Sequence, residues 1–201
     1  ESVKGEIEFD HVSFAYPEAG ENVLTDISFK AKKGQTIAVI GSTGSGKSTL
    51  INLIPRYYDV TKGSVKVDGV DVRDMTQKEL RDKLGYVPQK GVLFSGTIDS
   101  NIRYGKPEIT DAQVKEAAEV AQATEFIDTK PEKYKSPVSQ GGTNVSGGQK
   151  QRLSIARAIA KDPEIFIFDD SFSALNIKTD SQLRKALKEY TKDATTVIVA
   201  Q

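Results

Sequence analysis

The chain has 201 residues, of which 28 are basic and 28 acidic, so its formal net charge is zero. This balance gives no indication of a surface that binds nucleic acid or anionic lipid, and the absence of cysteine excludes a disulfide scaffold and suits a cytosolic setting. No apolar run is long enough to span a membrane, and the first residues (ESVKGEIEFD) lack the basic start and apolar stretch of a signal peptide.

The first third of the chain is expected to form strands. Residues 5–16 and 24–31 are rich in β-branched and aromatic residues with partial alternation, which is typical of antiparallel strands with one solvent-facing side. Residues 36–40 (TIAVI) are a short continuous apolar run, which predicts a strand buried on both faces. A glycine-rich loop with helix-like spacing follows, and residues 63–72 then have the pattern of a hairpin.

The rest of the chain alternates strands and helices. Its predicted elements are a strand at 86–88, helices at 111–127 and 146–160, a buried strand at 164–170, an amphipathic helix at 178–190 and a buried strand at 195–200. Leu183, Leu187 and Tyr190 lie on one stripe of the last helix. This alternation predicts an α/β core with a mostly parallel sheet, preceded by an antiparallel β subdomain.

The glycine-rich segment GSTGSGKS matches the phosphate-binding pattern G-x-x-x-x-G-K-[ST], after a predicted strand and before a predicted helix. Its glycines allow the backbone N–H groups to point at phosphate oxygens. Lys47 is expected to reach the β- and γ-phosphates, and the Ser48 hydroxyl to bind Mg²⁺. The predicted ATP-binding segment comprises Gly41, Ser42, Thr43, Gly44, Ser45, Gly46, Lys47, Ser48 and Thr49.

Two carboxylates end the buried strand IFIF. Asp169 is in the position of an acid that holds Mg²⁺ beside a phosphate-binding loop. Asp170 would then face the attacking water as a general base. Because Asp is one methylene shorter than Glu, its carboxylate is retracted by about one carbon–carbon bond. A misplaced base loses much of its effect on the rate, so this pair predicts weak hydrolysis.

The segment NVSGGQKQR opens a predicted helix. Ser146 and Gln149 have the S-x-x-Q spacing of a capping box. The box alone does not explain Gly147 and Gly148, which leave a bare helix N-terminus of the kind that binds anions.

Together these motifs resemble those of the ATP-binding cassette (ABC) ATPases, and the resemblance covers the whole chain. It implies an α/β P-loop NTPase fold with a helical signature subdomain, and ATP and Mg²⁺ as cofactors. By the same resemblance, Tyr16 in FAYP stacks on adenine, and Gln89 in YVPQ is the Q-loop residue that binds metal and takes part in the reaction. The signature motif comprises Ser146, Gly147, Gly148 and Gln149, Asn176 in SALN lies in the D-loop, and Gln201 takes the place of the switch histidine.

The segment LFSGTIDSNIRYG resembles the exporter branch of this family, in which the region lies under the membrane domains. The resemblance implies that residues 1–201 are an excised nucleotide-binding domain. An N-terminal transmembrane domain and the C-terminal end of the ATPase domain would be missing. The partners would be a second nucleotide-binding domain and transmembrane domains that contact residues 89–105. The location would be the cytoplasmic face of the cell membrane, within an integral membrane transporter.

Three residues depart from the family pattern. Asp170 replaces the usual Glu, Asn176 the D-loop Asp, and Gln201 the switch His. A glutamine side chain cannot carry a proton at physiological pH. The segments that bind nucleotide are intact, a combination that resembles the degenerate-site subunit of heterodimeric multidrug-type exporters. The only histidine, His11, lies in a predicted strand and is interpreted as a surface or packing residue.

Three other functions remain open. One is a homodimeric exporter in which Asp170 suffices as base, and another is an ATP clamp that never hydrolyses. A soluble ABC-type ATPase acting on DNA or the ribosome is the third. Zero net charge, the exporter-like segment and the absence of a coiled-coil insertion argue against this last one.

Overall fold

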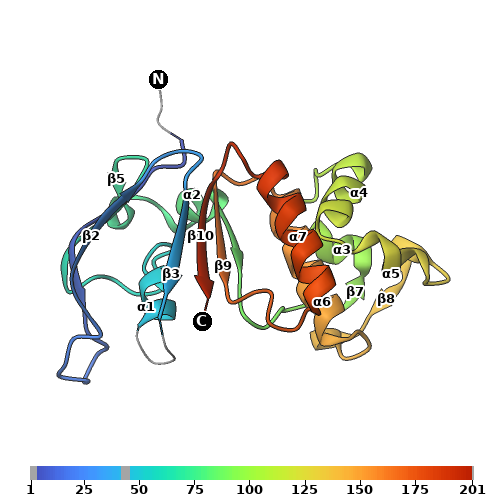
Figure 1. The fold of residues 1–201 in the computed structure, drawn as a ribbon, viewed down its shortest axis with the longest axis horizontal. Helices are drawn as coiled ribbons and strands as arrows, with labels where there is room; N and C mark the ends of the chain where they lie inside the picture. The colour runs from blue at the N-terminus through green and yellow to red at the C-terminus, as the bar shows by residue number, and fades with distance from the viewer. Residues whose placement is uncertain (1–3, 42–45, 201) are drawn as a thin grey trace. The chain divides into compact units, whose positions relative to one another are not determined.

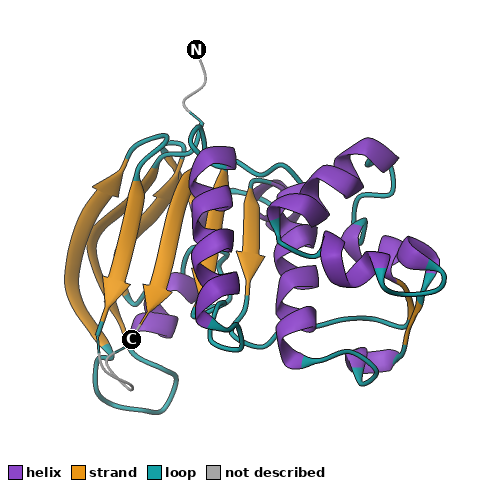
Figure 2. Ribbon diagram, turned by 45° about the vertical axis from the view of Figure 1, so that its right-hand side comes forward, coloured by secondary structure: helices purple, strands orange, loops and turns teal. Residues whose placement is uncertain are grey.

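The computed structural model describes residues 4–41 and 46–200. The chain divides into two compact units, which we call the strand unit and the helical unit. The strand unit consists of Glu1–Gly85, Glu164–Asp169 and Lys192–Gln201, and the helical unit of Tyr86–Pro163 and Asp170–Thr191. Strands predominate in the first and helices in the second (Figure 2).

An antiparallel sheet forms the first part of the strand unit, with strand order β2-β1-β4-β5 (Figure 1). Its strands are β1 (Ile7–Phe14), β2 (Leu24–Ala31), β4 (Lys62–Val67) and β5 (Val70–Asp71). Phe9 of β1 is buried and stacks on Phe29 of β2 with ring centroids 4.6 Å apart. The predicted antiparallel subdomain and the hairpin are confirmed.

A bulge interrupts β1 in the middle of this sheet. The pairing of β1 shifts register between Phe9 and Val12 on one side and between Asp10 and Ser13 on the other. His11 takes a positive φ of 48°, and Gly63 of β4 lies against it with a φ of 77°. A Cβ on Gly63 would lie 2.3 Å from the backbone oxygens of Asp10 and His11, so only glycine fits there.

The second sheet has the strand order β3-β10-β9-β6. Its strands are β3 (Thr36–Ile40), β10 (Thr195–Ala200), β9 (Ile165–Asp169) and β6 (Leu84–Val87), and β10 pairs in parallel with both β3 and β9. As predicted, the first four residues of β9 are fully buried. The prediction that the strand at 36–40 is buried on both faces is wrong. That strand is at the edge of its sheet, its residues alternate between exposed and half-buried, and Ile40 is 77% exposed.

Short helices complete the strand unit. They are α1 (Lys47–Asn52), the 3₁₀ helix η1 (Val72–Asp74) and α2 (Gln77–Asp82). Thr76 and Glu79 form a capping box at the start of α2, in which each side chain accepts a hydrogen bond from the other residue's backbone N–H.

The helical unit packs around the 14-residue helix α6. It contains α3 (Ile98–Ile102), α4 (Asp111–Val120), α5 (Thr124–Asp128), α6 (Gly147–Ala160) and α7 (Ile177–Tyr190). Two 3₁₀ helices, η2 (Lys133–Lys135) and η3 (Gln140–Gly142), and a short ribbon of β7 (Gly96–Thr97) with β8 (Pro137–Val138) complete it. Helices α3 and α4 pack on α6, and α4 also contacts α7.

Two predictions on these helices have different outcomes. The stripe on α7 is confirmed, because Leu183 and Leu187 are buried, and half-burial of Tyr190 raises the pKa of its hydroxyl. The single helix predicted at 111–127 is instead two helices. Gln122 takes a φ of 61°, and the Ala123 N–H donates to the Ala118 carbonyl at 2.8 Å, which ends α4 before α5 begins.

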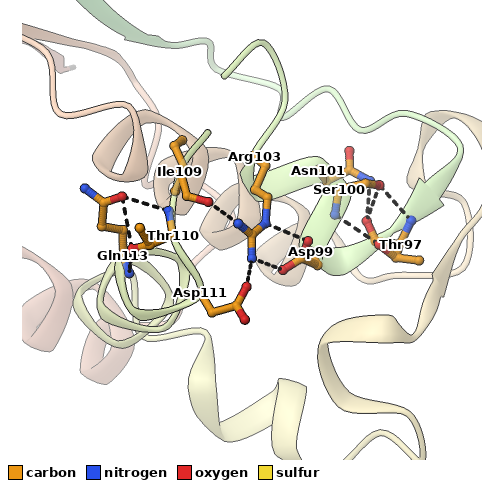
Figure 3. Close-up of polar contacts among 9 residues, drawn as sticks. All are labelled: Thr97, Asp99, Ser100, Asn101, Arg103, Ile109, Thr110, Asp111 and Gln113. Atoms are coloured by element: carbon orange, nitrogen blue, oxygen red, sulfur yellow. Dashed lines mark hydrogen bonds and ion pairs between the residues drawn. The ribbon is translucent and has the colours of Figure 1, made fainter. Parts of the chain in front are cut away.

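Arg103 connects the end of α3 to the start of α4 (Figure 3). Its guanidinium donates to both carboxylate oxygens of Asp99, to the Ile109 carbonyl and to Asp111. These contacts fix the two helix ends to each other.

In the part of the chain that the structure describes, no helix combines the length and the apolar character needed to cross a membrane.

Candidate nucleotide-binding site

The structure describes both ends of the predicted phosphate-binding loop. Gly46 precedes α1 with a φ of 88°, and a Cβ there would come within 3.2 Å of the Val23 and Leu24 side chains, so glycine is required. Lys47, the first residue of α1, donates through Nζ to the Gly41 carbonyl. The remaining loop residues, Ser42, Thr43, Gly44 and Ser45, lie outside the described residues.

Ser48 and Asp169 lie together in the strand unit. The Ser48 hydroxyl is exposed and donates to Asp169 Oδ1 at 3.3 Å, although the two residues are 121 positions apart in the chain. Asp169 ends the buried strand β9 and is itself half-buried. A hydroxyl and a carboxylate are hard oxygen donors of the kind that Mg²⁺ prefers, so this donor set fits the predicted metal.

Tyr16 is held beside α1. Its hydroxyl makes a 2.6 Å hydrogen bond with the Thr49 hydroxyl, which is buried in α1. The Tyr16 ring meets Phe14 edge-on at 4.9 Å and Tyr58 at 5.2 Å, which fixes its orientation. Because the side chain is only half-buried, part of the ring remains open. Its stacking on adenine stays a prediction.

Gln89 and Asp170 lie together in the helical unit. Gln89 Nε2 donates to Asp170 Oδ2 across a long distance of 3.5 Å. Asp170 takes a positive φ of 48°, a conformation that Asp tolerates better than most residues. The next residue, Ser171, is buried and donates to the Val87 carbonyl at 2.6 Å. This bond connects the segment after β9 to the segment that leads to Gln89.

The predicted capping box at α6 is present. The Ser146 hydroxyl accepts from the Gln149 N–H at 3.1 Å, and Gln149 Oε1 accepts from the Ser146 N–H at 3.2 Å. Gly147 is exposed, and a Cβ on Gly148 would lie 3.2 Å from the Ala174 carbonyl oxygen. The Ser146 hydroxyl therefore caps the N-terminus of α6, and Gly147 and Gly148 leave the first two positions of its first turn without side chains. This turn is in close contact with the segment around Ala174.

Two features near α7 were not found in the sequence. Asn176 caps α7 by accepting from the Thr179 N–H at 2.8 Å, and the spacing N-x-x-T was a usable signal for this cap. Gln151 is buried on α6 and bonds both to the Gln89 carbonyl and to the Ala174 N–H. No motif pointed to this role.

Gln201 lies outside the described residues.

Each unit gathers part of the predicted site. The strand unit brings together Tyr16, Lys47, Ser48, Thr49 and Asp169. The helical unit brings together the residues expected to take part in hydrolysis and in contacts with a partner, which are Gln89, Asp170, Ser146, Gly147, Gly148, Gln149 and Asn176.

The chain is similar to known proteins over most of its length. A family model described as "ABC transporter" matches residues 24–173. YgaD of Bacillus subtilis (strain 168), named provisionally as a multidrug export ATP-binding/permease protein, is 46% identical over 200 residues, which are 100% of this chain and 34% of that protein. A similarly named protein of Staphylococcus aureus (strain NCTC 8325) is 47% identical over 197 residues, covering 98% of this chain and 34% of that protein.

A solved structure of a bacterial Atm1-family ABC exporter with ATP bound superimposes with a TM-score of 0.93 at 37% identity. It covers 98% of this chain and 34% of that one, so the chain spans about a third of the length of its exporter relatives. The phosphate-loop lysine, the Ser48–Asp169 pair and the capped SGGQ helix all lie within or beside the matched region. The chain has the ABC ATPase fold and belongs to the ABC transporter family.

Proposed function

We propose that this chain binds Mg-ATP and, paired with a second nucleotide-binding domain, drives export of a substrate across a membrane. The observation that carries this proposal is the 3.3 Å contact between Ser48 and Asp169 directly beside Lys47. Ser48 and Asp169 would hold Mg²⁺, which supplies positive charge to the β- and γ-phosphates. Gln89 is the further metal ligand that the family resemblance implies. Lys47 would exchange its bond to the Gly41 carbonyl for the phosphates.

The chain's own site is proposed to hydrolyse ATP slowly. A working general base must lie within hydrogen-bonding distance of the attacking water. Asp170 is shorter than the usual Glu, and Gln89 Nε2 donates to its Oδ2 only at 3.5 Å. Gln201 cannot replace a histidine as a proton carrier. These substitutions support a degenerate site in a heterodimer. The photolabelling experiment below separates this proposal from a homodimer in which Asp170 suffices.

The second nucleotide-binding domain is proposed to meet the N-terminus of α6. Ser146, Gly147 and Gly148 present a hydroxyl and a bare helix N-terminus, which suit the γ-phosphate of an ATP held by the partner. In a heterodimer whose other subunit carries the Glu and the His, this chain would then contribute its signature segment to the faster site.

The membrane domains are proposed to contact an apolar patch formed by Val92, Phe94 and Tyr104. These side chains are 51%, 39% and 56% exposed, and the Phe94 and Tyr104 rings stack with centroids 4.3 Å apart. Arg157 supports the patch, because its guanidinium lies 5.4 Å and 5.6 Å from the two ring centroids and donates to the Val92 carbonyl at 2.8 Å. Burial lowers the pKa of Arg157.

Such a supported apolar surface suits the tip of a membrane-domain helix. The location would then be the cytoplasmic face of a membrane, with residues 1–201 as the nucleotide-binding part of a longer transporter.

Photolabelling of the complete transporter with vanadate and an azido-ATP tests which site works. Vanadate with ADP mimics the transition state, so it traps nucleotide only where hydrolysis occurs. We expect vanadate-dependent labelling on the partner's phosphate loop and vanadate-independent labelling on this chain. Lys47→Ala should remove the label from this chain, and Lys33→Ala is the matched control. Vanadate-dependent labelling of this chain would contradict the degenerate-site proposal, and no ATP-dependent label on either chain would contradict the function itself.

A further inference from the structure

Both polar atoms of the Gln151 side-chain amide form hydrogen bonds inside the helical unit. The residue is only 4% exposed on α6, and its Oε1 accepts from the Ala174 N–H at 3.0 Å. Its Nε2 donates to the Gln89 carbonyl at 2.9 Å and to the Ser173 hydroxyl at 3.3 Å. A backbone N–H only donates and a carbonyl only accepts, so these partners determine the orientation of the amide.

Close backbone packing holds the same two segments against α6. A Cβ on Gly91, two residues after Gln89, would lie 2.6 Å from the Ser154 hydroxyl and 2.9 Å from the Lys150 carbonyl oxygen. On the other side, Gly148 lets the Ala174 carbonyl approach α6. Neither close contact involves the Gln151 side chain. Both show that the two segments pack directly against the backbone and side chains of α6.

The three segments joined in this way have different proposed tasks. Helix α6 carries Ser146, Gly147 and Gly148 at its start, one turn before Gln151. Under the proposed function, Gln89, which bonds to Asp170, serves the chain's own nucleotide, and the segment that ends at the helix cap Asn176 follows Asp170 directly. A displacement of α6 therefore moves both loops through one buried amide, and a displacement of either loop moves α6.

We propose that Gln151 is a positioning residue that ties the Gln89 and Ser173–Asn176 segments to helix α6, so that occupancy of the partner's ATP site and occupancy of this chain's own site are coupled. The inference rests on the proposed function, because it needs two composite sites. Gln151 touches no phosphate in this account and acts only through the loops that it holds.

Steady-state kinetics on the complete transporter with its natural partner test the proposal. Gln151→Leu keeps the volume of the side chain but leaves the Ala174 N–H and the Gln89 carbonyl without their partner. We expect kcat to fall by about tenfold or more, as expected when reacting groups lose their alignment, with the KM for ATP nearly unchanged. Thr191→Val is the matched control, because it removes another buried hydrogen bond of the same unit, from Thr191 to the Leu187 carbonyl at 2.6 Å.

Gln151→Glu gives a readout that loss of stability alone would not produce. Glutamate keeps the acceptor for the Ala174 N–H but, when ionised, faces the Gln89 carbonyl with a negative oxygen. Burial and this carbonyl raise the pKa of such a carboxyl. In its protonated form it donates to the carbonyl as glutamine does. The activity of Gln151→Glu relative to wild type should therefore rise as pH falls, while that of Thr191→Val should not.

Hydrogen exchange at the Ala174 amide decides the inference independently of turnover. Exchange should be faster in Gln151→Leu than in wild type and Gln151→Glu, and ATP should no longer slow it. A kcat equal to that of Thr191→Val, a flat relative pH profile for Gln151→Glu, or wild-type exchange in Gln151→Leu would each overturn the proposal. If wild-type transporter fails to turn over ATP, the proposed function falls, and the exchange result alone still decides the role of Gln151. If Gln151→Leu does not assemble, the pH profile of Gln151→Glu decides.

Discussion

The strand unit and the helical unit divide the predicted chemistry between them. In the strand unit, Gly46, Lys47, Ser48 and Asp169 match the family pattern, and the structure gives each a fixed partner or a required conformation. The helical unit contains two of the departures, Asp170 and Asn176. The third, Gln201, lies outside the described residues.

This division indicates which functions are retained. Residues that would bind phosphate and metal are intact, and so is the capped N-terminus of α6, which would serve a partner's nucleotide. Two of the altered residues, Asp170 and Gln201, are those that would handle the attacking water and the chain's own γ-phosphate. Under the proposed function, this chain would serve the partner's nucleotide through its signature segment while its own site is slow.

The largest effect is expected from Ser146→Arg, which places a bulky cation at the start of α6. Turnover of the complete transporter should fall by about 10²–10³-fold, because the donors that stabilise charge on the partner's γ-phosphate are displaced. Thr110→Arg is the matched control, since Thr110 caps α4 with an equivalent capping box to Gln113 (Figure 3). Steady-state ATPase measurements check the result, and equal losses in the two variants would show that only helix capping matters.

A smaller effect is expected from Tyr16→Ala in the strand unit. Loss of base stacking should weaken ATP binding by about 1–3 kcal/mol, or roughly 5- to 150-fold, and should weaken GTP binding comparably. Tyr16→Phe keeps the ring and removes only the 2.6 Å bond to Thr49, so it should bind nearly as tightly as wild type.

Equilibrium binding of a fluorescent ATP analogue measures both variants. Tyr57→Ala is the control, because Tyr57 is an exposed tyrosine of the same unit that has no role in the proposed site. Unchanged affinity in Tyr16→Ala would mean that the ring only packs against Phe14 and Tyr58.

Asp170→Asn is expected to have a modest effect on turnover of the complete transporter. Removal of a working general base costs about 10²–10⁴-fold, and a loss far below this range would place the working site elsewhere. Asp170→Glu alone should gain little, because Asn176 and Gln201 remain substituted. Steady-state ATPase with the partner unchanged gives both numbers. If Asp170→Asn were as damaging as Ser146→Arg, the comparison between the two units would fail and the homodimer interpretation would gain support.

Sequence reasoning succeeded where the signal is local. The capping box of Ser146 and Gln149 and the buried strand before Asp169 depend on residues a few positions apart, and both are present. It failed where the outcome depends on distant segments. The strand at 36–40 has an apolar pattern, yet its exposure follows from its place at the edge of the sheet.

The helix predicted at 111–127 shows a second kind of failure. It ends early because Gln122 takes a left-handed conformation that usually needs glycine, so the sequence contains no break signal. Gln151 shows a third kind. Its buried amide joins α6 to two segments that are distant in the chain, and a polar residue in a helix is normally interpreted as solvent-facing.

The smallest expected effect concerns His11, which the sequence predicted to be a surface or packing residue and which the structure places on the surface. Its side chain is 76% exposed, with Nδ1 2.7 Å from Asp26 and Nε2 3.8 Å from Asp10. The hydrogen bond and charge of Asp26, with a contribution from Asp10, raise the pKa of His11. Because the folded pKa lies above the unfolded one, the stabilisation is fully present below the unfolded pKa. It is lost as pH rises through the folded pKa.

His11→Asn suits the positive φ of 48° and removes the titration. The thermal midpoint of wild type should therefore exceed that of His11→Asn at about pH 5 by a small margin that shrinks by about pH 8.5. Affinity for ATP should be the same in both proteins, because His11 lies in β1 and has no role in the proposed site. A difference in thermal midpoint that is the same at both pH values would show that His11 stabilises the fold by packing rather than by its charge interaction with Asp26. A change in ATP affinity would show that the stability of the antiparallel sheet and nucleotide binding are not separable within the strand unit.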